Sequence, residues 1–180
     1  MPEQLRGGAS EFEVWYFDEA GFSLTPSVPY AWQEIGERIE LESSGSGGQR
    51  QNVLGFLRWD GGDFYCAAFE GRIDSSVAAG CFRQFAAAKK STQPKLIVLD
   101  NAPMHRSEEF AEELEELAKW GVLVKFLPSY SPELNLIEML WKKIKYEWLP
   151  LNIYGSFKMM SEGLFEVLKG IGSKYRITFV

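Results

Sequence analysis

Two aspartates and one glutamate stand at positions where carboxylates could act together. Asp18 follows the apolar segment Val14–Phe17, and Asp100 follows Lys95–Leu99. Continuous apolar runs of this kind favour strands buried in a sheet. We therefore expect each aspartate at the carboxyl end of its strand, where open α/β sheets gather ligands. If the two strands are neighbours, Glu138 from a later helix could complete the cluster.

The helix that carries Glu138 is predicted to begin at Pro132, with Ser131 as its N-cap. Proline is favoured at the first helical position because its missing N–H would have no partner there. At about 100° per residue, Glu138 falls at the flank of the apolar stripe, with Lys142 one turn further along. Glu133 would lie in the first turn, where its charge complements the helix dipole and a structural role is favoured over a metal role.

Carboxylates that lie close together repel one another unless a cation is bound between them. Two of them about 4 Å apart repel by about 4 kcal/mol at an effective dielectric of 20. Carboxylate oxygens are the ligands that Mg²⁺ and Mn²⁺ prefer, whereas zinc sites usually include His or Cys, and the chain has only one histidine. Two such ions can activate a water or a 3′-hydroxyl and stabilise the leaving oxygen of a phosphodiester.

The remaining pattern predicts the elements that must position these residues. Asp60–Asp63 supplies a tight turn between two strands, and the glycine-rich residues 43–48 are expected to be a loop because they lack the Gly-Lys-Ser/Thr ending of a phosphate loop. The order is a β-meander followed by α-β-α-β, which indicates an α/β fold. The predicted strands are 14–17, 52–59, 64–69, 95–99 and 122–127, and the predicted helices are 75–89, 107–120, 132–148 and 157–171.

The formal charge of −6 is unusual for a protein that acts on DNA, because phosphate attraction normally produces a basic face. Six of the 25 acidic residues lie within Glu108–Glu116, and without them the acidic and basic residues balance at 19 each. Apolar residues recur at helical spacing in the same segment. The acidity is therefore the solvated face of one helix.

A length of 180 residues fits one domain. No apolar run approaches the roughly 20 residues that span a bilayer, and residues 1–8 lack the features of a secretory signal. We therefore predict no membrane association and a cytoplasmic location. Cys66 and Cys81 form no C-x-x-C pair, which predicts buried free thiols instead of a zinc site or a disulfide.

Three segments of the chain are similar to the signature blocks of DDE transposases of the mariner and bacterial insertion-sequence superfamily. They are residues 17–22 (FDEAGF), 99–107 (LDNAPMHRS) and 130–141 (YSPELNLIEMLW). The resemblance spans most of the chain, and its second and third blocks are specific. It implies an α/β, ribonuclease H-like fold with a mixed five-stranded sheet flanked by helices. It also implies cleavage at the ends of a transposable element and strand transfer into target DNA.

By the same resemblance, the catalytic and metal-binding triad is Asp18, Asp100 and Glu138, with Mg²⁺ or Mn²⁺ as the cofactor. Glu19 and Asn101 are candidates for supporting contacts around the metal ligands. Three further residues are candidates for contacts with DNA, each beside a simpler alternative. His105 would contact a phosphate or face solvent before a helix, Lys142 would contact DNA or pair with Glu138, and Lys145 would contact DNA or be solvated.

Members of this family usually carry an amino-terminal helix-turn-helix region that recognises the element's ends, whereas the first block here begins within the first 20 residues. We expect residues 1–180 to form a single catalytic domain without that region. Recognition of the element's ends would then come from a separate helix-turn-helix polypeptide, and a homodimer is compatible with this arrangement.

Two other functions remain open at this stage. The same fold and metal chemistry serve structure-specific nucleases and hydrolases of RNA–DNA hybrids, although the block at 130–141 favours a transposase. The chain could also be a catalytically inactive transposase remnant that persists as an interaction module. Intact acids in all three blocks favour an active enzyme.

Overall fold

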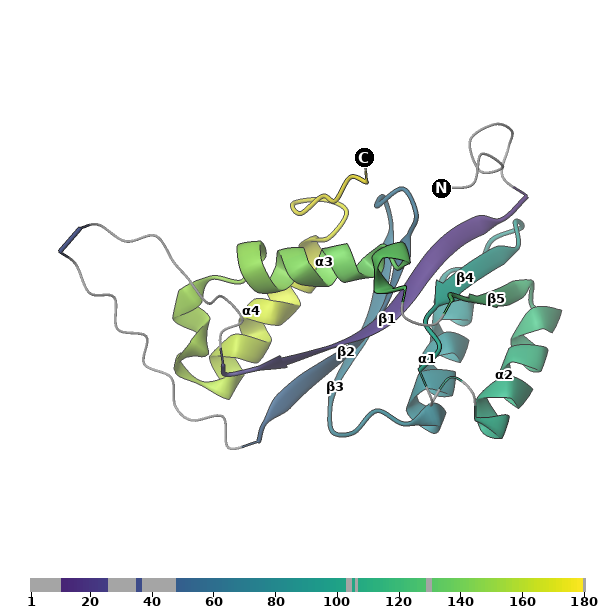
Figure 1. The fold of residues 1–180 in the computed structure, drawn as a ribbon, viewed down its shortest axis with the longest axis horizontal. Coiled ribbons are helices and arrows are strands. Elements are labelled where there is room, and N and C mark those ends of the chain that lie inside the picture. The colour runs from purple at the N-terminus through teal and green to yellow at the C-terminus, as the bar shows by residue number, and fades with distance from the viewer. Residues whose placement is uncertain are drawn as a thin grey trace.

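The computed structural model describes residues 11–25, 35–36, 48–102, 105, 107–128 and 131–179. Five strands form one mixed sheet in the order β3-β2-β1-β4-β5 (Figure 1). The β1–β2 and β2–β3 pairs are antiparallel, and the β1–β4 and β4–β5 pairs are parallel. The strands are β1 (Glu13–Ser23), β2 (Arg50–Arg58), β3 (Phe64–Glu70), β4 (Lys95–Leu99) and β5 (Val122–Phe126).

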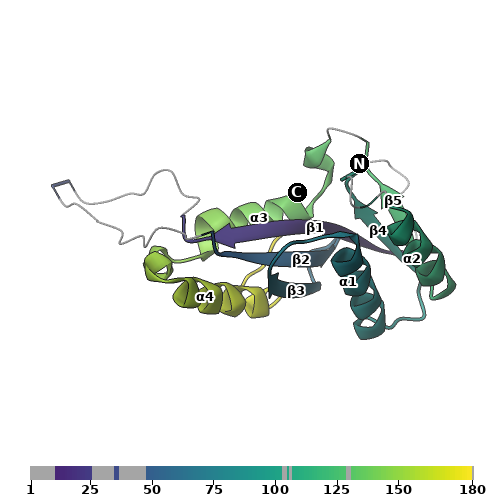
Figure 2. The same cartoon turned by 90° about the horizontal axis from the view of Figure 1, so that it is seen from below.

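Helices cover both faces of this sheet. The α-helices are α1 (Ser75–Ala88), α2 (Glu108–Lys119), α3 (Ile137–Lys143) and α4 (Phe157–Gly170). Short helical segments surround α3: the 3₁₀ turn η3 (Pro132–Leu134), the π-helical turn η4 (Ile144–Trp148) and the 3₁₀ segment η5 (Leu151–Gly155). In Figures 1 and 2, α1 and α2 lie next to each other, at the opposite end of the molecule from α4.

The alternation of side chains along the strands divides the core into two clusters. Trp15 and Phe17 of β1 pack with α1 and α2, whereas Tyr16, Ala20 and Phe22 pack with α3 and α4. Each face of the sheet is thus buried against one pair of helices. The expected mixed five-stranded sheet flanked by helices is confirmed.

Local sequence determines where several helices begin. The Asp74 side chain accepts a hydrogen bond from the Val77 N–H at the start of α1, and Ser107 does the same for Phe110 at the start of α2. These caps satisfy backbone donors that would otherwise lack a partner. The glutamates of α2 lie mainly on its exposed side while Phe110 and Leu117 are buried, as predicted.

Two predicted boundaries are wrong. β1 does not end at Phe17 but continues through Asp18 to Ser23, because β2 pairs with it along that whole length. The helix predicted from Pro132 is divided: η3 is a single 3₁₀ turn, and α3 begins only at Ile137. The predicted loop at residues 43–48 lies outside the described residues except for Gly48.

Both cysteines are free, with Cys81 buried and Cys66 partly buried, as predicted. Burial raises the pKa of the Cys66 thiol to about 11 and that of Cys81 to about 12. Neither is therefore a reactive thiolate near neutral pH. Within the described ranges, no helix is long and apolar enough to cross a membrane; the cytoplasmic location stays a prediction.

Candidate active site

Asp18 and Asp100 lie side by side in the register of two neighbouring strands. β1 and β4 are parallel, and their register runs from Glu13 opposite Lys95 to Tyr16 opposite Val98. Two residues further along each chain are Asp18 and Asp100. Asp100 follows the last residue of β4, as predicted, whereas Asp18 lies within β1. The two strands are neighbours, which is the condition for a site that both aspartates share.

Asp18 and its neighbour Glu19 lie on opposite faces of β1. Asp18 shares its face with Tyr16 and Ala20, which pack towards α3, and Glu19 shares its face with Phe17, which packs towards α1 and α2. Only Asp18 is therefore on the side of the sheet from which α3 presents Glu138.

Glu138 lies in the first turn of α3 and borders the core, as its position on the helical stripe predicted. Ile137 and Leu140 beside it are fully buried. Close approach of α3 to the sheet depends on Gly55, the residue paired with Asp18 on β2. A Cβ atom at position 55 would lie only 2.6 Å from the ring of Trp141. A glycine opposite Asp18 thus lets the helix bring Glu138 to this part of the sheet.

The later start of α3 changes the assignment of Glu133. This residue lies in the exposed 3₁₀ turn η3 and not in the first turn of an α-helix, so the predicted dipole interaction is wrong. The acid in the first turn is Glu138. Burial raises the pKa of Glu138, the positive charge of Lys142 opposes this change, and the negative charges of Asp100 and Glu133 add to it.

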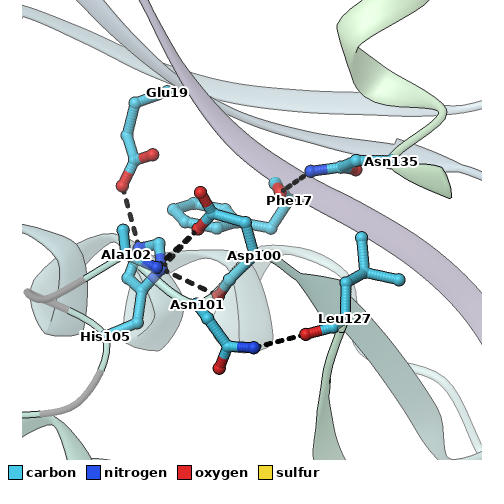
Figure 3. A network of polar contacts seen from close by, with 8 residues as sticks. All are labelled: Phe17, Glu19, Asp100, Asn101, Ala102, His105, Leu127 and Asn135. Atoms are coloured by element: carbon cyan, nitrogen blue, oxygen red, sulfur yellow. Dashed lines mark hydrogen bonds and ion pairs between the residues drawn. The ribbon is translucent and has the colours of Figure 1, made fainter. Parts of the chain in front are cut away.

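The side chain of His105 lies between Glu19 of β1 and Asp100, which follows β4. Its Nε2 atom is 2.9 Å from Oε1 of Glu19, and its Nδ1 atom is 3.0 Å from Oδ1 of Asp100 (Figure 3). The imidazole is completely buried and packs against Phe17 and Phe110. The alternative of a solvent-facing histidine is therefore wrong. A phosphate contact is also disfavoured, because both ring nitrogens already face protein carboxylates.

The ionisation of this group follows from its contacts. Burial alone would lower the pKa of His105, but the hydrogen bonds and charges of Asp100 and Glu19 outweigh burial and raise it to about 9. The hydrogen bond from His105 to Asp100 is also the main reason that the pKa of Asp100 is lowered. At neutral pH the site therefore contains an imidazolium that donates to both carboxylates. Oδ1 of Asp100 also accepts from the Ala102 N–H, at 3.1 Å.

The pKa of Asp18 shifts in the opposite direction from that of Asp100. Burial, followed by the negative charges of Glu19, Asp100 and Glu138, raises its pKa to about 7. The coupling to Asp100 and Glu138 means that carboxylates from three separate segments of the chain lie within electrostatic range of one another. The cationic His105 does not compensate Asp18, because its two nitrogens are used by Glu19 and Asp100. Excess negative charge of this kind is what a bound divalent cation would neutralise.

The oxygen donors are of the type that Mg²⁺ and Mn²⁺ prefer. In the described part of the chain, no three His, Cys, Asp or Glu side chains already converge at metal-binding distances. The residues therefore fit such an ion by their chemistry and by their shared location, and metal binding would require the side chains to turn towards one another.

The predicted lysines lie close to these acids. Lys142 is exposed and interacts electrostatically with Glu138. Lys145 lies in η4, with its Nζ atom 5.3 Å from the centre of the Phe22 ring. Burial lowers the pKa of Lys145, as does the positive charge of Arg50, whereas the negative charge of Asp18 raises it. Both lysines can therefore supply positive charge beside the carboxylates.

Two asparagine side chains hold the backbone around the end of β4. Asn101, a predicted supporting residue, donates through Nδ2 to the carbonyl of Leu127, just after β5. Asn135 donates through Nδ2 to the carbonyl of Phe17, at 3.1 Å. Figure 3 shows these two contacts on either side of Asp100. Asn135 lies in the block at 130–141, but its role could not be predicted because its partner Phe17 is 118 residues away in the sequence.

Two cavities lie away from this cluster. One of about 490 Å³ is lined by residues at the ends of β2 and β3, including Arg50 and Arg72, and one of about 370 Å³ lies between β3 and α4. None of the triad residues lines them. The acidic site is therefore not part of either cavity.

The mixed sheet with strand order β3-β2-β1-β4-β5 and its flanking helices form a ribonuclease H-like fold, and comparisons with known proteins agree. A family model described as DDE superfamily endonuclease matches residues 13–161. The chain therefore belongs to the DDE superfamily endonucleases. A search of curated protein sequences finds no match.

Similar solved structures include two of the Mos1 transposase. A paired-end complex with the left transposon end has a TM-score of 0.62 and 14% identity, over 94% of this chain and 53% of that chain. A mariner paired-end complex with Mn has a TM-score of 0.56 and 15% identity, over 89% and 49%. The catalytic core domain of BIV integrase has a TM-score of 0.55 and 13% identity, over 91% and 85%. This chain spans about half the length of the Mos1 chains.

Proposed function

We propose that this chain is the catalytic core of a DNA transposase, which cleaves phosphodiester bonds at the ends of a transposable element and joins them to target DNA. The observation that carries the proposal is that Asp100, directly after β4, and Glu138, in the first turn of α3, both act electrostatically on Asp18 of β1 and raise its pKa. Membership of the DDE superfamily endonucleases and the likeness to Mos1 transposase support it.

In this proposal Asp18, Asp100 and Glu138 hold Mg²⁺ or Mn²⁺, with two ions as the expected number. The ions would supply charge that activates a water or a 3′-hydroxyl and stabilises the leaving oxygen. His105, held by Glu19, keeps Oδ1 of Asp100 engaged and leaves Oδ2 for the metal. Lys142 and Lys145 provide positive charge for the DNA backbone. His105 itself is a positioning residue here, and not a contact to DNA.

We assign recognition of the element's ends to a helix-turn-helix unit outside residues 1–180, consistent with the single catalytic domain that the sequence predicts. The formal charge of −6 supports this division, since tight DNA binding needs many cationic contacts. A homodimer would bring two such catalytic cores to the two ends of one element.

The test is cleavage of duplex DNA that carries the ends of the encoding element, with Mn²⁺ and with a supplied helix-turn-helix polypeptide. Wild-type protein should nick the DNA, and Asp100→Ala and Glu138→Gln should reduce the rate at least about a hundredfold, as expected for loss of a group that acts on the transition state. Glu133→Gln is the matched control, because Glu133 is exposed one turn before α3, and it should retain activity.

Two outcomes would contradict the proposal in different ways. Equal nicking by the wild-type and Asp100→Ala proteins would remove the catalytic assignment. Cleavage confined to branched DNA or RNA–DNA hybrids, with the same dependence on Asp100, would retain the metal site and replace the transposase with a structure-specific nuclease.

A further inference from the structure

The hydrogen-bond ladder between β1 and β4 is interrupted next to Asp18 and Asp100, and a side chain supplies the missing donor. Trp59 donates its N–H to the Val14 carbonyl, so the even-numbered carbonyls of β1 face β2 and the odd-numbered ones face β4. The carbonyl of Phe17 therefore points to the β4 side. If the parallel pairing continued, this carbonyl would accept from the Asp100 N–H, but β4 ends at Leu99. The donor to the Phe17 carbonyl is instead Nδ2 of Asn135.

Asn135 also contacts the helix that carries the third acid. It lies between η3 and α3, and its main-chain carbonyl accepts from the Glu138 N–H at 3.0 Å. One residue thus joins the backbone directly before Asp18, through its side chain, to the backbone of Glu138, through its main chain. It does so on the side of β1 where Asp100 leaves the sheet.

Asn135 is a polar residue in a buried position where its side chain is only partly hydrogen-bonded. The residue is only 2% exposed, and its Oδ1 atom has no hydrogen-bond partner among the described residues. An unsatisfied buried acceptor is destabilising, and an apolar residue of similar shape would avoid that loss. An asparagine here is therefore poorly explained by packing alone.

We infer that Asn135 is a positioning residue for the proposed metal site: its amide holds β1 apart from the end of β4 and fixes Asp18 relative to Glu138. The inference rests on the proposed function and adds a residue that contacts neither metal nor substrate. Loss of the amide would let the Phe17 carbonyl seek another donor, such as the Asp100 N–H, which would shift the backbone of both aspartates. The three carboxylates would then match a divalent ion less well.

The test compares Asn135→Leu with Asn52→Leu in the full chain. Asn52 is a matched control because it is also buried and also donates through Nδ2 to a main-chain carbonyl, that of Gly71, which is not part of the acidic group. Bound Mn²⁺ is measured without DNA, from the loss of the electron paramagnetic resonance signal of the free ion. The Mn²⁺ concentration for half-maximal DNA nicking, and the nicking rate at saturating Mn²⁺, are measured separately.

We expect Asn135→Leu to need about tenfold more Mn²⁺ in both measurements, the lower range for loss of a contact that orients metal ligands, with much of the nicking rate recovered at saturation. Asn52→Leu should bind Mn²⁺ as the wild type does, even where it lowers the melting temperature as much. If Asn135→Leu does not fold, Asn135→Ala removes the amide without added bulk and should show the same shift.

The inference is overturned if Asn135→Leu binds Mn²⁺ like the wild type, or if both variants lose Mn²⁺ binding to the same extent. These results differ from failure of the proposed function, in which the wild type itself would neither bind Mn²⁺ nor nick DNA; that result would remove both.

Discussion

Asp18 is the acid whose ionisation the fold changes most clearly, and the change has a measurable effect on stability. The pKa of Asp18 rises from 3.8 to about 7 through burial and the neighbouring carboxylates. An acid with a raised folded-state pKa stabilises the protein fully below its unfolded pKa, and this stability is lost as the pH rises through the folded pKa. His105, raised from 6.5 to about 9, acts in the same direction over a higher range.

We therefore predict that the metal-free protein loses stability as the pH rises from about 4 to 9, with Asp18 responsible between about 4 and 7. Asp18→Asn should remove that part and, at pH 8 in EDTA, should increase the free energy of unfolding by up to about 4 kcal/mol. Urea unfolding at pH 5 and pH 8 measures this effect. Mn²⁺ should stabilise only the wild type. Equal pH dependence in both proteins would show that Asp18 ionises freely.

The sequence predicted Asp18, Asp100 and Glu138 as the acids of the proposed site but not their surroundings. These three acids stand out in the sequence because each lies in a recognisable block and beside a predicted element. The role of His105 could not, since its partners Glu19 and Asp100 are 86 and 5 residues away and only the folded sheet brings them together. Local sequence carries no information about which side chain occupies a buried site between two distant acids.

The close contact between β2 and α3 is the feature of the elements that places Glu138. Gly55 has no Cβ atom where Trp141 approaches, and an added Cβ would also lie 3.2 Å from Cδ1 of Ile137. Both neighbours are buried residues of α3, and the large Trp141 ring has little room to move aside. The space at position 55 therefore sets how near Glu138 comes to Asp18.

We predict that Gly55→Ala destabilises the protein by about 1–3 kcal/mol, the usual cost of overpacking a core, and also lowers the rate of DNA nicking because α3 is displaced. Gly80→Ala is the matched control. Its Cβ would meet only the end of the Arg83 side chain, at 3.9 Å, and alanine favours the helix by up to about 1 kcal/mol. Thermal unfolding and nicking by the two variants are compared. If the Gly55→Ala protein keeps full activity, α3 does not need this contact.

The helices and strands were largely predictable because the spacing of apolar residues in the sequence reflects which side of each element is buried. Two element boundaries were not predictable. The run Val14–Phe17 predicts a strand that stops at the first acid, yet pairing with β2 extends β1 through Asp18. Ser131 and Pro132 predict a helix start, yet the hydrogen bond of the Asn135 side chain to β1 holds the chain in another path before α3. In both cases a contact distant in sequence decides where the element ends.

The charge of the whole molecule limits how it would hold the DNA of the proposed function. With a formal charge of −6 and an acidic helix α2, the chain as a whole repels a polyanion. Cationic groups close to the triad must then provide most of the local attraction, and Lys142 and Lys145 are the predicted ones. Exposed lysines elsewhere, such as Lys158 and Lys169 on α4, lie within 4 Å of glutamates on the same helix.

This distribution of lysines predicts that DNA affinity depends more on where a lysine lies than on the net charge of the protein. In EDTA, the double substitution Lys142→Gln with Lys145→Gln should weaken binding to a labelled duplex of arbitrary sequence, and the slope of log affinity against log salt should fall by about 2, one for each lost phosphate contact. Lys158→Gln with Lys169→Gln changes the net charge equally and should leave the slope unchanged. Fluorescence anisotropy over a salt series measures both. Equal weakening by the two pairs would mean that the DNA responds only to overall charge, and that the lysines beside the acids form no defined path for its backbone.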